Sequence, residues 1–251
     1  MVAARDYPQD AFEGWEAFER ANRYWFRARE RLIGWAIERY FPAARSMIEV
    51  GCGTGSVLRF LHASRPSLEL SGVDASPRAI ELAGERVDGV RLATGDVRAL
   101  PAAHPYDVAG AFDVIEHLDD DAGALAALRE AVRPGGGVIL TVPQHPWLWS
   151  AYDEYARHKR RYRRRELIER VRAAGLEPER VTSFITLPLP ALALSRARVR
   201  GGEGYDPVAE GSKPPPLAGL LDRLLAVEAA AIRRGVSLPA GGSLLAVARR
   251  P

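Results

Sequence analysis

The sequence predicts an α/β fold with a mostly parallel sheet and helices on both of its faces. Between residues 47 and 140, short apolar segments alternate with longer helical patterns, which is typical of parallel strands joined by right-handed crossovers. The first apolar segment ends in alternating glycines at Gly51, Gly53 and Gly55, and the second ends in an acidic residue, Asp74. Because ligands bind such sheets at the carboxyl ends of their strands, these loops locate the expected site.

Helical patterns precede and separate the predicted strands. Aromatic and aliphatic residues recur at helical spacing over residues 11–40, which predicts one or two helices before the sheet. Within the sheet region we expect helices over residues 56–63, 77–87 and 122–132. The sequence Ser76-Pro77 supports the second of these, since serine caps helices and proline suits their first turn.

The glycine-rich loop predicts a ligand that carries a ribose. Alternate glycines let the backbone approach a ligand closely and turn from a strand into a helix. Asp74 follows at about the distance at which a second strand presents an acid to a ribose diol. A dinucleotide fingerprint would place its third glycine at position 56, where this chain has Ser56. The spacing therefore disfavours a nicotinamide-dependent oxidoreductase, which remains one alternative.

Five segments together resemble the class I S-adenosylmethionine-dependent methyltransferases, in the branch that acts on small molecules and glycans. The segment from Glu49 to Gly55 resembles the first motif of that family, and four further segments match it in order: 71–76, 94–97, 106–117 and 133–140. The resemblance implies a Rossmann-like sheet of seven strands with an antiparallel last strand. It also implies a helix over 165–174 and strands over 179–186 and 243–248.

The same resemblance implies S-adenosylmethionine as the cofactor and assigns its contacts. The acid of the second strand, Asp74, binds the ribose hydroxyls, and Asp96 after the third strand faces the adenine. Trp25 and Arg29, before the sheet, lie near the sulfonium and the carboxylate of the cofactor. The expected cofactor-binding residues are Trp25, Arg29, Glu49, Gly51, Gly53, Gly55, Asp74, Ala75, Ser76, Asp96, Val97, Phe112 and His117.

Several of these assignments have a structural alternative. Trp25 and Arg29 also fit an amphipathic helix that buries its aromatic side chains against the domain. Asp74 also fits a cap of the following helix, and His117 also fits such a cap. Asp96 also fits a solvated loop.

Residues 143–158 form the expected acceptor site, because they follow a strand end beside the glycine-rich loop and mix aromatic with titratable side chains. His158 and His145 are the candidates for a base that removes a proton from the acceptor. Tyr152 and Asp153 are the candidates for orienting the acceptor or that histidine. We expect no metal, since no cluster has recognisable ligand spacing, although His145, Asp153 and His158 could meet in space.

Residues 159–165 form a basic run. Solvated charge is the first interpretation of this run. Binding of an acidic or phosphorylated acceptor and binding of RNA are the alternatives. No appended RNA-binding module is visible in the sequence, so we expect no nucleic-acid partner.

Residues 183–240 are longer than a plain crossover between two strands needs. Glycine and proline are frequent over residues 201–216, which indicates a mobile loop. A helix over residues 217–232 then places several leucines on one face, which we expect to pack on the same domain. The alternatives are a lid, a dimer contact, or a membrane-surface patch that admits a lipid-linked acceptor. The leucines of this face are Leu217, Leu220, Leu221, Leu224 and Leu225.

Length, charge and cysteine content favour one cytoplasmic domain. The 251 residues carry a net charge of +3 and a single cysteine, which excludes an internal disulfide and fits a reducing compartment. We divide the domain into an N-terminal helical segment over the cofactor (1–44), a core (45–182), an insertion or lid (183–240) and the last strand (241–251).

The sequence thus predicts a methyltransferase whose acceptor is a small molecule or is linked to a glycan or lipid, with a hydroxyl group favoured as the site of methylation. A non-catalytic S-adenosylmethionine-binding sensor or partner subunit is the alternative. The sequence does not name the acceptor, the oligomeric state or the general base.

Overall fold

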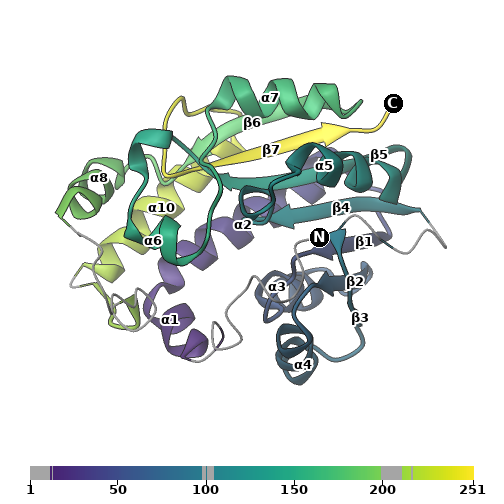
Figure 1. Ribbon diagram of the computed structural model, residues 1–251, viewed down its shortest axis with the longest axis horizontal. Helices are drawn as coiled ribbons and strands as arrows, with labels where there is room; N and C mark the ends of the chain where they lie inside the picture. Colours follow the sequence, from purple (N-terminus) through teal and green to yellow (C-terminus); the bar gives the residue numbers. More distant parts are fainter. Residues whose placement is uncertain (1–11, 13, 98–99, 101–104, 199–210, 216) are drawn as a thin grey trace.

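One sheet holds every named strand of the described residues, which are 12, 14–97, 100, 105–198, 211–215 and 217–251 of this computed structural model (Figure 1). The strand order is β3-β2-β1-β4-β5-β7-β6, and β7 runs antiparallel to both of its neighbours. The other pairs are parallel, so the predicted fold class is confirmed. The strands are β1 (Ser46–Val50), β2 (Glu69–Asp74), β3 (Arg91–Thr94), β4 (Tyr106–Phe112), β5 (Val132–Pro143), β6 (Glu177–Phe184) and β7 (Ser243–Arg249).

Helices whose ends are fixed by local caps begin and end within a few residues of the predicted positions. Ser76 accepts a hydrogen bond from Ala79 N at the start of α4, and Asp120 accepts one of 2.8 Å from Gly123 N at the start of α5. The helices are α1 (Trp15–Ala21), α2 (Arg23–Tyr40), α3 (Ser56–Ser64), α4 (Pro77–Arg86), α5 (Asp121–Ala131), α6 (Ala151–Tyr155), α7 (Arg164–Ala173), α8 (Leu189–Arg198) and α10 (Ala218–Arg233).

Two hydrophobic clusters cover the two faces of the sheet. Successive residues of β1 point to opposite faces, so Met47 belongs to one cluster and Ile48 to the other. Apolar residues of α2, α3 and α10 pack on the Met47 face, and those of α5 and α7 pack on the Ile48 face. Helices on both faces leave the loops at the strand ends as the place for a ligand.

The sheet changes direction between β1 and β4, which lie side by side although β2 and β3 separate them in the chain. The loops after β1, β2, β4 and β5 therefore meet near this point. Helices α1, α6 and α8 lie beyond the same end of the sheet, at the left of the view in Figure 1. The N-terminal helices and the insertion are thus brought to the predicted site.

Three expectations for the second half of the chain need correction. The strand expected over 179–186 is β6, which ends at Phe184 because Ile185 takes a positive φ of 60°. The apolar segment after it contains a helix, α8, that the sequence did not indicate. Helix α10 buries Leu225 and Ile232, whereas its first leucines, Leu217 and Leu220, are exposed. Most of the loop expected over 201–216 lies outside the described residues.

Candidate functional site

A cavity of about 920 Å³ opens at the carboxyl ends of β1, β2, β4 and β5. Its walls come from the N-terminal helices, from the loops after these strands and from α8 of the insertion. Among the expected cofactor residues, those that line it are Trp25, Arg29, Glu49, Gly51, Gly53, Asp74, Ala75, Ser76, Phe112 and His117.

The loop after β1 needs its glycines. Gly51, Gly53 and Gly55 have positive φ values of 67°, 51° and 76°, a region that other residues rarely adopt. A Cβ atom at Gly51 would lie 2.5 Å from a methyl carbon of Val114. A Cβ atom at Gly53 would meet nothing within 4 Å, so the backbone there borders open space. This geometry lets a ligand approach the main chain.

Asp74 ties the two cofactor loops together. Its Oδ2 accepts a hydrogen bond of 2.8 Å from Gly53 N, and its Oδ1 accepts one of 2.9 Å from Ser76 N. The cap alternative therefore holds in part, because the carboxylate organises the start of α4 while it lines the cavity. Burial raises the pKa of Asp74 above its usual value, against the lowering effect of the two backbone N–H groups.

Glu49 is a buried acid in the floor of the cavity. Its side chain is 3% exposed, and its Oε2 has no hydrogen-bond partner among the described residues. Burial raises the pKa of Glu49 to about 8, although the nearby Arg29 opposes the shift. A buried polar oxygen without a partner is costly, and a cationic ligand in the cavity would compensate it.

Arg29 joins the N-terminal helices to the loop after β4. Its Nη1 donates a hydrogen bond of 2.7 Å to Asp113, and its guanidinium lies 4.6 Å from the ring centre of Trp25. Thr141 also donates to Asp113, over 3.1 Å. Asp113 has a positive φ of 58°, a strained conformation for a side-chain-bearing residue and one often found at functional sites. Helix α2 packs aromatic side chains on the domain and also lines the cavity, so the two interpretations of α2 are compatible.

The acceptor side is organised around Asp153, which is fully buried. Nδ1 of His158 lies 2.9 Å from its Oδ1. Arg161 donates to the same carboxylate over 3.2 Å and Arg196 over 2.9 Å. Burial alone would raise the pKa of Asp153, but the hydrogen bond from His158 and the two guanidinium groups lower it to about 2. The Asp153 carboxylate is thus ionised at neutral pH, and its contact with Nδ1 fixes the orientation of the His158 imidazole.

Tyr152 lies beside this pair, with its ring centre 6.2 Å from that of His158. Burial, together with the charge of Asp113, raises the pKa of Tyr152 to about 12, so its hydroxyl is neutral at physiological pH. Tyr152, Asp153 and His158 all line the cavity. The structure therefore brings three of the four expected catalytic residues together.

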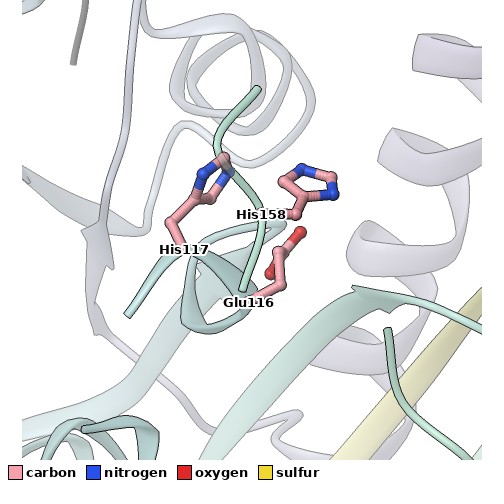
Figure 2. Close-up of side chains that lie close together, drawn as sticks. All are labelled: Glu116, His117 and His158. Carbon is pink, nitrogen blue, oxygen red and sulfur yellow. The ribbon is translucent and has the colours of Figure 1, made fainter. Parts of the chain in front are cut away.

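Glu116 and His117 come from η2 (Ile115–His117), the turn that follows β4, and meet His158 in space (Figure 2). The ring centres of the two histidines are 4.6 Å apart. Burial, and then the charge of His158, lowers the pKa of His117 to about 3. Burial, and then the charge of Asp113, raises the pKa of Glu116 well above its usual value.

Four expected residues do not line the cavity: Gly55, Asp96, Val97 and His145. Gly55 instead provides the N-cap of α3. His145 is the clearest correction, because a positive φ of 63° redirects the chain there and the imidazole packs 5.3 Å from the ring of Trp147. The idea that His145 meets Asp153 and His158 is therefore not supported by the structure. Asp96 is half-buried, and the described residues are interrupted after Val97, its neighbour in the chain.

Sequence reasoning missed Asp113, Glu116, Arg161 and Arg196 as cavity residues. Glu116 could have been predicted, since it directly precedes His117 at the end of a predicted strand. Arg161 belongs to the basic run, which was interpreted as solvated charge. The residue is only 4% exposed, so this interpretation is wrong at that position. Arg196 comes from α8, so no local pattern indicated it.

Other members of the basic run are also paired rather than available as a patch. Arg160 lies 2.8 Å from Asp121, and Arg165 lies 2.7 Å from Glu169. Arg164 donates to the carbonyl oxygen of Val181 over 2.6 Å. These three arginines are thus engaged in interactions within the chain.

Comparison with known proteins shows similarity to methyltransferases. The family model described as a methyltransferase domain matches residues 17–181. A ubiquinone biosynthesis O-methyltransferase from Thiobacillus denitrificans is 26% identical over 211 residues, which cover 72% of this chain and 89% of that protein. A trans-aconitate 2-methyltransferase from Azoarcus sp. is 31% identical over 111 residues, which cover 44% of this chain and 42% of that protein. The match thus spans less than half the length of the second relative.

A solved structure from Thermotoga maritima shares the fold. It is described as an S-adenosylmethionine-dependent methyltransferase and possible histamine N-methyltransferase. The similarity has a TM-score of 0.61 at 20% identity and covers 97% of each chain. At that identity the likeness shows the fold alone.

Proposed function

Because the chain belongs to the class I S-adenosylmethionine-dependent methyltransferases, we propose that it transfers a methyl group from S-adenosylmethionine to a small-molecule acceptor, with a hydroxyl group as the favoured site. One observation carries this proposal. A single cavity of about 920 Å³ is lined both by the cofactor loops and by the Tyr152–Asp153–His158 group. A cofactor and an acceptor in one cavity can meet without an intermediate carrier.

In this proposal the cofactor occupies the part of the cavity beside the glycine-rich loop. Asp74 binds the ribose hydroxyls, and the backbone after Gly51 borders the amino-acid tail. Trp25 offers an aromatic face to the sulfonium, and Arg29 lies next to it over the cofactor carboxylate. Support comes from their shared place in the cavity wall and from the cation–ring contact between Arg29 and Trp25.

The acceptor occupies the part of the cavity between α6 and α8. Tyr152 and Arg157 line this part, and Leu192 and Leu221 from the insertion add apolar surface. Such a wall suits an acceptor with an apolar body and a few polar groups. The ubiquinone biosynthesis relative, named as an O-methyltransferase, is consistent with a hydroxyl acceptor.

Catalysis in this proposal is mainly alignment. The acceptor oxygen attacks the methyl carbon in line, the oxygen–carbon bond forms, and the electron pair of the broken carbon–sulfur bond stays on sulfur to give S-adenosylhomocysteine. A sulfonium is already an activated leaving group, so positioning supplies much of the acceleration. The acceptor proton leaves at His158, whose imidazole is oriented by Asp153 at 2.9 Å.

The N-terminal segment and the insertion act as covers of the cavity in this account. Trp15 and Phe18 of α1 close the cofactor side, and Leu192 and Arg196 of α8 close the acceptor side. The exposed Leu217 and Leu220 at the start of α10 favour the further proposal that this end contacts a lipid surface, a lipid-linked acceptor or a second copy. None of the described helices is long and apolar enough to span a bilayer.

Turnover of S-adenosylmethionine tests the function. Purified protein is incubated with the cofactor and a panel of phenols, hydroxy acids, sugars and amines, and S-adenosylhomocysteine is measured. We expect production above the acceptor-free rate with at least one hydroxylated compound. Amine-only turnover would contradict the hydroxyl preference. Tight cofactor binding without turnover on the whole panel would favour the non-catalytic sensor or partner subunit.

A further inference from the structure

The cavity contains a cluster of three potential metal ligands. Glu116 and His117 are neighbours in η2, and His158 follows α6. One donor atom from each side chain lies within 4.8 Å of the other two. Figure 2 shows the three side chains directed toward a common space. The cluster lies in the wall of the proposed acceptor site.

The Glu116 carboxylate has little direct compensation among the described residues. The residue is fully buried, and neither carboxylate oxygen has a hydrogen-bond partner among the described residues. The nearby guanidinium groups are already engaged, since Arg29 lies 2.7 Å from Asp113 and Arg161 lies 3.2 Å from Asp153. A buried carboxylate without a partner is costly, and a bound cation would remove that cost.

His158 is held as metal-binding histidines commonly are. Its Nδ1 lies 2.9 Å from Asp153, and an ionised carboxylate can only accept, so Nδ1 carries the hydrogen. Its Nε2 is therefore the atom with a lone pair to donate to a ligand. A carboxylate behind a ligating imidazole fixes its tautomer and orientation. Asp153 is itself fixed by Ser150, whose backbone N–H donates to it over 2.9 Å.

We propose that Glu116, His117 and His158 bind one divalent transition-metal ion, of the class represented by Zn²⁺, Fe²⁺ and Co²⁺. Two imidazoles and one carboxylate are ligands that these ions prefer, and three protein ligands leave positions open for water or substrate. Mg²⁺ and Ca²⁺ prefer oxygen ligands throughout, so the donor set selects against them.

This inference deepens the proposed function and rests on it for the role of the ion. The ion would bind the acceptor hydroxyl oxygen beside the methyl group and lower the pKa of that hydroxyl, as a Lewis acid does. The hydroxyl proton then leaves to water, and the oxygen lone pair attacks the methyl carbon as described above. His158 acts in this case as a ligand of the ion instead of accepting the proton itself.

Ion binding can be measured without cofactor or acceptor. Chelator-treated protein is titrated with Co²⁺, and the visible absorption of the bound ion is followed. We expect a saturable signal at one ion per chain that excess Zn²⁺ removes and excess Mg²⁺ does not. Glu116→Gln keeps the side-chain shape but removes the charge, and we expect it to weaken Co²⁺ binding by at least tenfold, the lower end of losses seen even for residues behind the ligands.

Matched variants separate the site from general effects. Glu154→Gln removes an exposed carboxylate from α6, and His62→Asn removes an exposed imidazole from α3. Both should bind Co²⁺ like the unchanged protein. His158→Asn and His117→Asn, each checked by circular dichroism and thermal unfolding, should lose binding as Glu116→Gln does. If one variant fails to fold, the others still test the site.

Two results would overturn the inference: no saturable Co²⁺ signal in the unchanged protein, or equal Co²⁺ affinity in the unchanged protein and Glu116→Gln. S-adenosylmethionine turnover is then measured separately. Co²⁺ binding without turnover on any acceptor would contradict the proposed function but leave the site in place. Full turnover in chelator-treated protein that binds no Co²⁺ would leave the function in place and contradict the site.

Discussion

Arg29 of α2 donates a hydrogen bond of 2.7 Å to Asp113, the residue that follows β4. The pair connects the N-terminal helices to the sheet at the floor of the cavity. Arg29 is 8% exposed, so the interaction is largely shielded from water. It therefore couples the position of a proposed cofactor cover to the loop that carries Glu116 and His117.

We expect this pair to contribute measurably to stability. Hydrogen bonds between charged groups contribute about 1.5–3 kcal/mol. A double-mutant cycle with Arg29→Met and Asp113→Asn, measured by urea unfolding, should give a coupling energy of about 1–3 kcal/mol. Asparagine tolerates the positive φ at position 113, which limits backbone effects.

The exposed pair of Arg91 and Glu69, 3.5 Å apart, provides the control cycle. Exposed ion pairs contribute about 0–1 kcal/mol. A coupling energy at Arg29 and Asp113 no larger than that of the control would show that this pair does not join α2 to the loop after β4.

Alanine at position 51 should disrupt the cofactor site more than alanine in place of another glycine with a similar positive φ. Gly51 and Gly89 have similar positive φ values of 67° and 73°, but only at Gly51 would a Cβ atom clash, at 2.5 Å from Val114. Both alanine variants should lose about 1–2 kcal/mol of stability from the backbone conformation. Gly51→Ala should in addition weaken S-adenosylmethionine binding by about tenfold or more, measured by calorimetry, because the loop must shift. Equal cofactor affinity in the two variants would contradict the assigned loop.

Asp74→Asn tests the ribose assignment. The two backbone N–H groups bond to different carboxylate oxygens of Asp74, so the amide oxygen can keep only one of these bonds, to Gly53 or to Ser76. The amide also loses the charge that strengthens bonds to ribose hydroxyls. The loss of about 1.5–3 kcal/mol corresponds to roughly a tenfold to hundredfold lower affinity for S-adenosylmethionine. Asp88→Asn, at an exposed position, is the control. Unchanged affinity in Asp74→Asn would leave Asp74 with its capping role alone.

Glu49 should make the folded protein less stable as the pH rises. Its pKa is about 8 in the folded protein and near 4.5 in the unfolded chain, so the folded state holds an extra proton between these values. Stability then falls as pH rises from about 4.5 to 8. Glu49→Gln removes this proton uptake, and its stability at pH 9, relative to pH 6, should exceed that of the unchanged protein by about 2–4 kcal/mol. Parallel pH profiles in urea unfolding would refute a neutral Glu49.

The parts of the fold that the sequence predicted well are those set by neighbouring residues. Ser76 and Asp120 cap α4 and α5 through bonds to amides three residues later, so the start of each helix is a local property. The alternation of apolar segments with helical patterns likewise predicted the parallel strands. Helix α8 was missed because its proline and leucines form no clear periodic pattern, and its place depends on Glu228, which accepts from the backbone of Ile185, Thr186 and Leu187.

The candidate site divides in the same way. The places of Asp74, Gly51 and Gly53 in the cavity wall could be predicted because they depend on the spacing between one strand and the next. Arg196 could not, because it reaches Asp153 from 43 positions away in the chain. His145 was expected in the cavity because its segment follows a strand end beside the glycine-rich loop, but the positive φ at that residue directs it elsewhere. Side-chain direction in loops depends on backbone angles that composition does not reveal.

Calorimetric titration of the purified protein with S-adenosylmethionine, S-adenosylhomocysteine and NAD tests whether the cavity is a site for the methyl donor. We expect saturable binding of the first two at one site per chain, with dissociation constants on the order of micromolar, about −8 kcal/mol, and no binding of NAD. Binding of NAD alone, or of none of the three ligands, would contradict a cofactor site built from Asp74 and the glycine-rich loop.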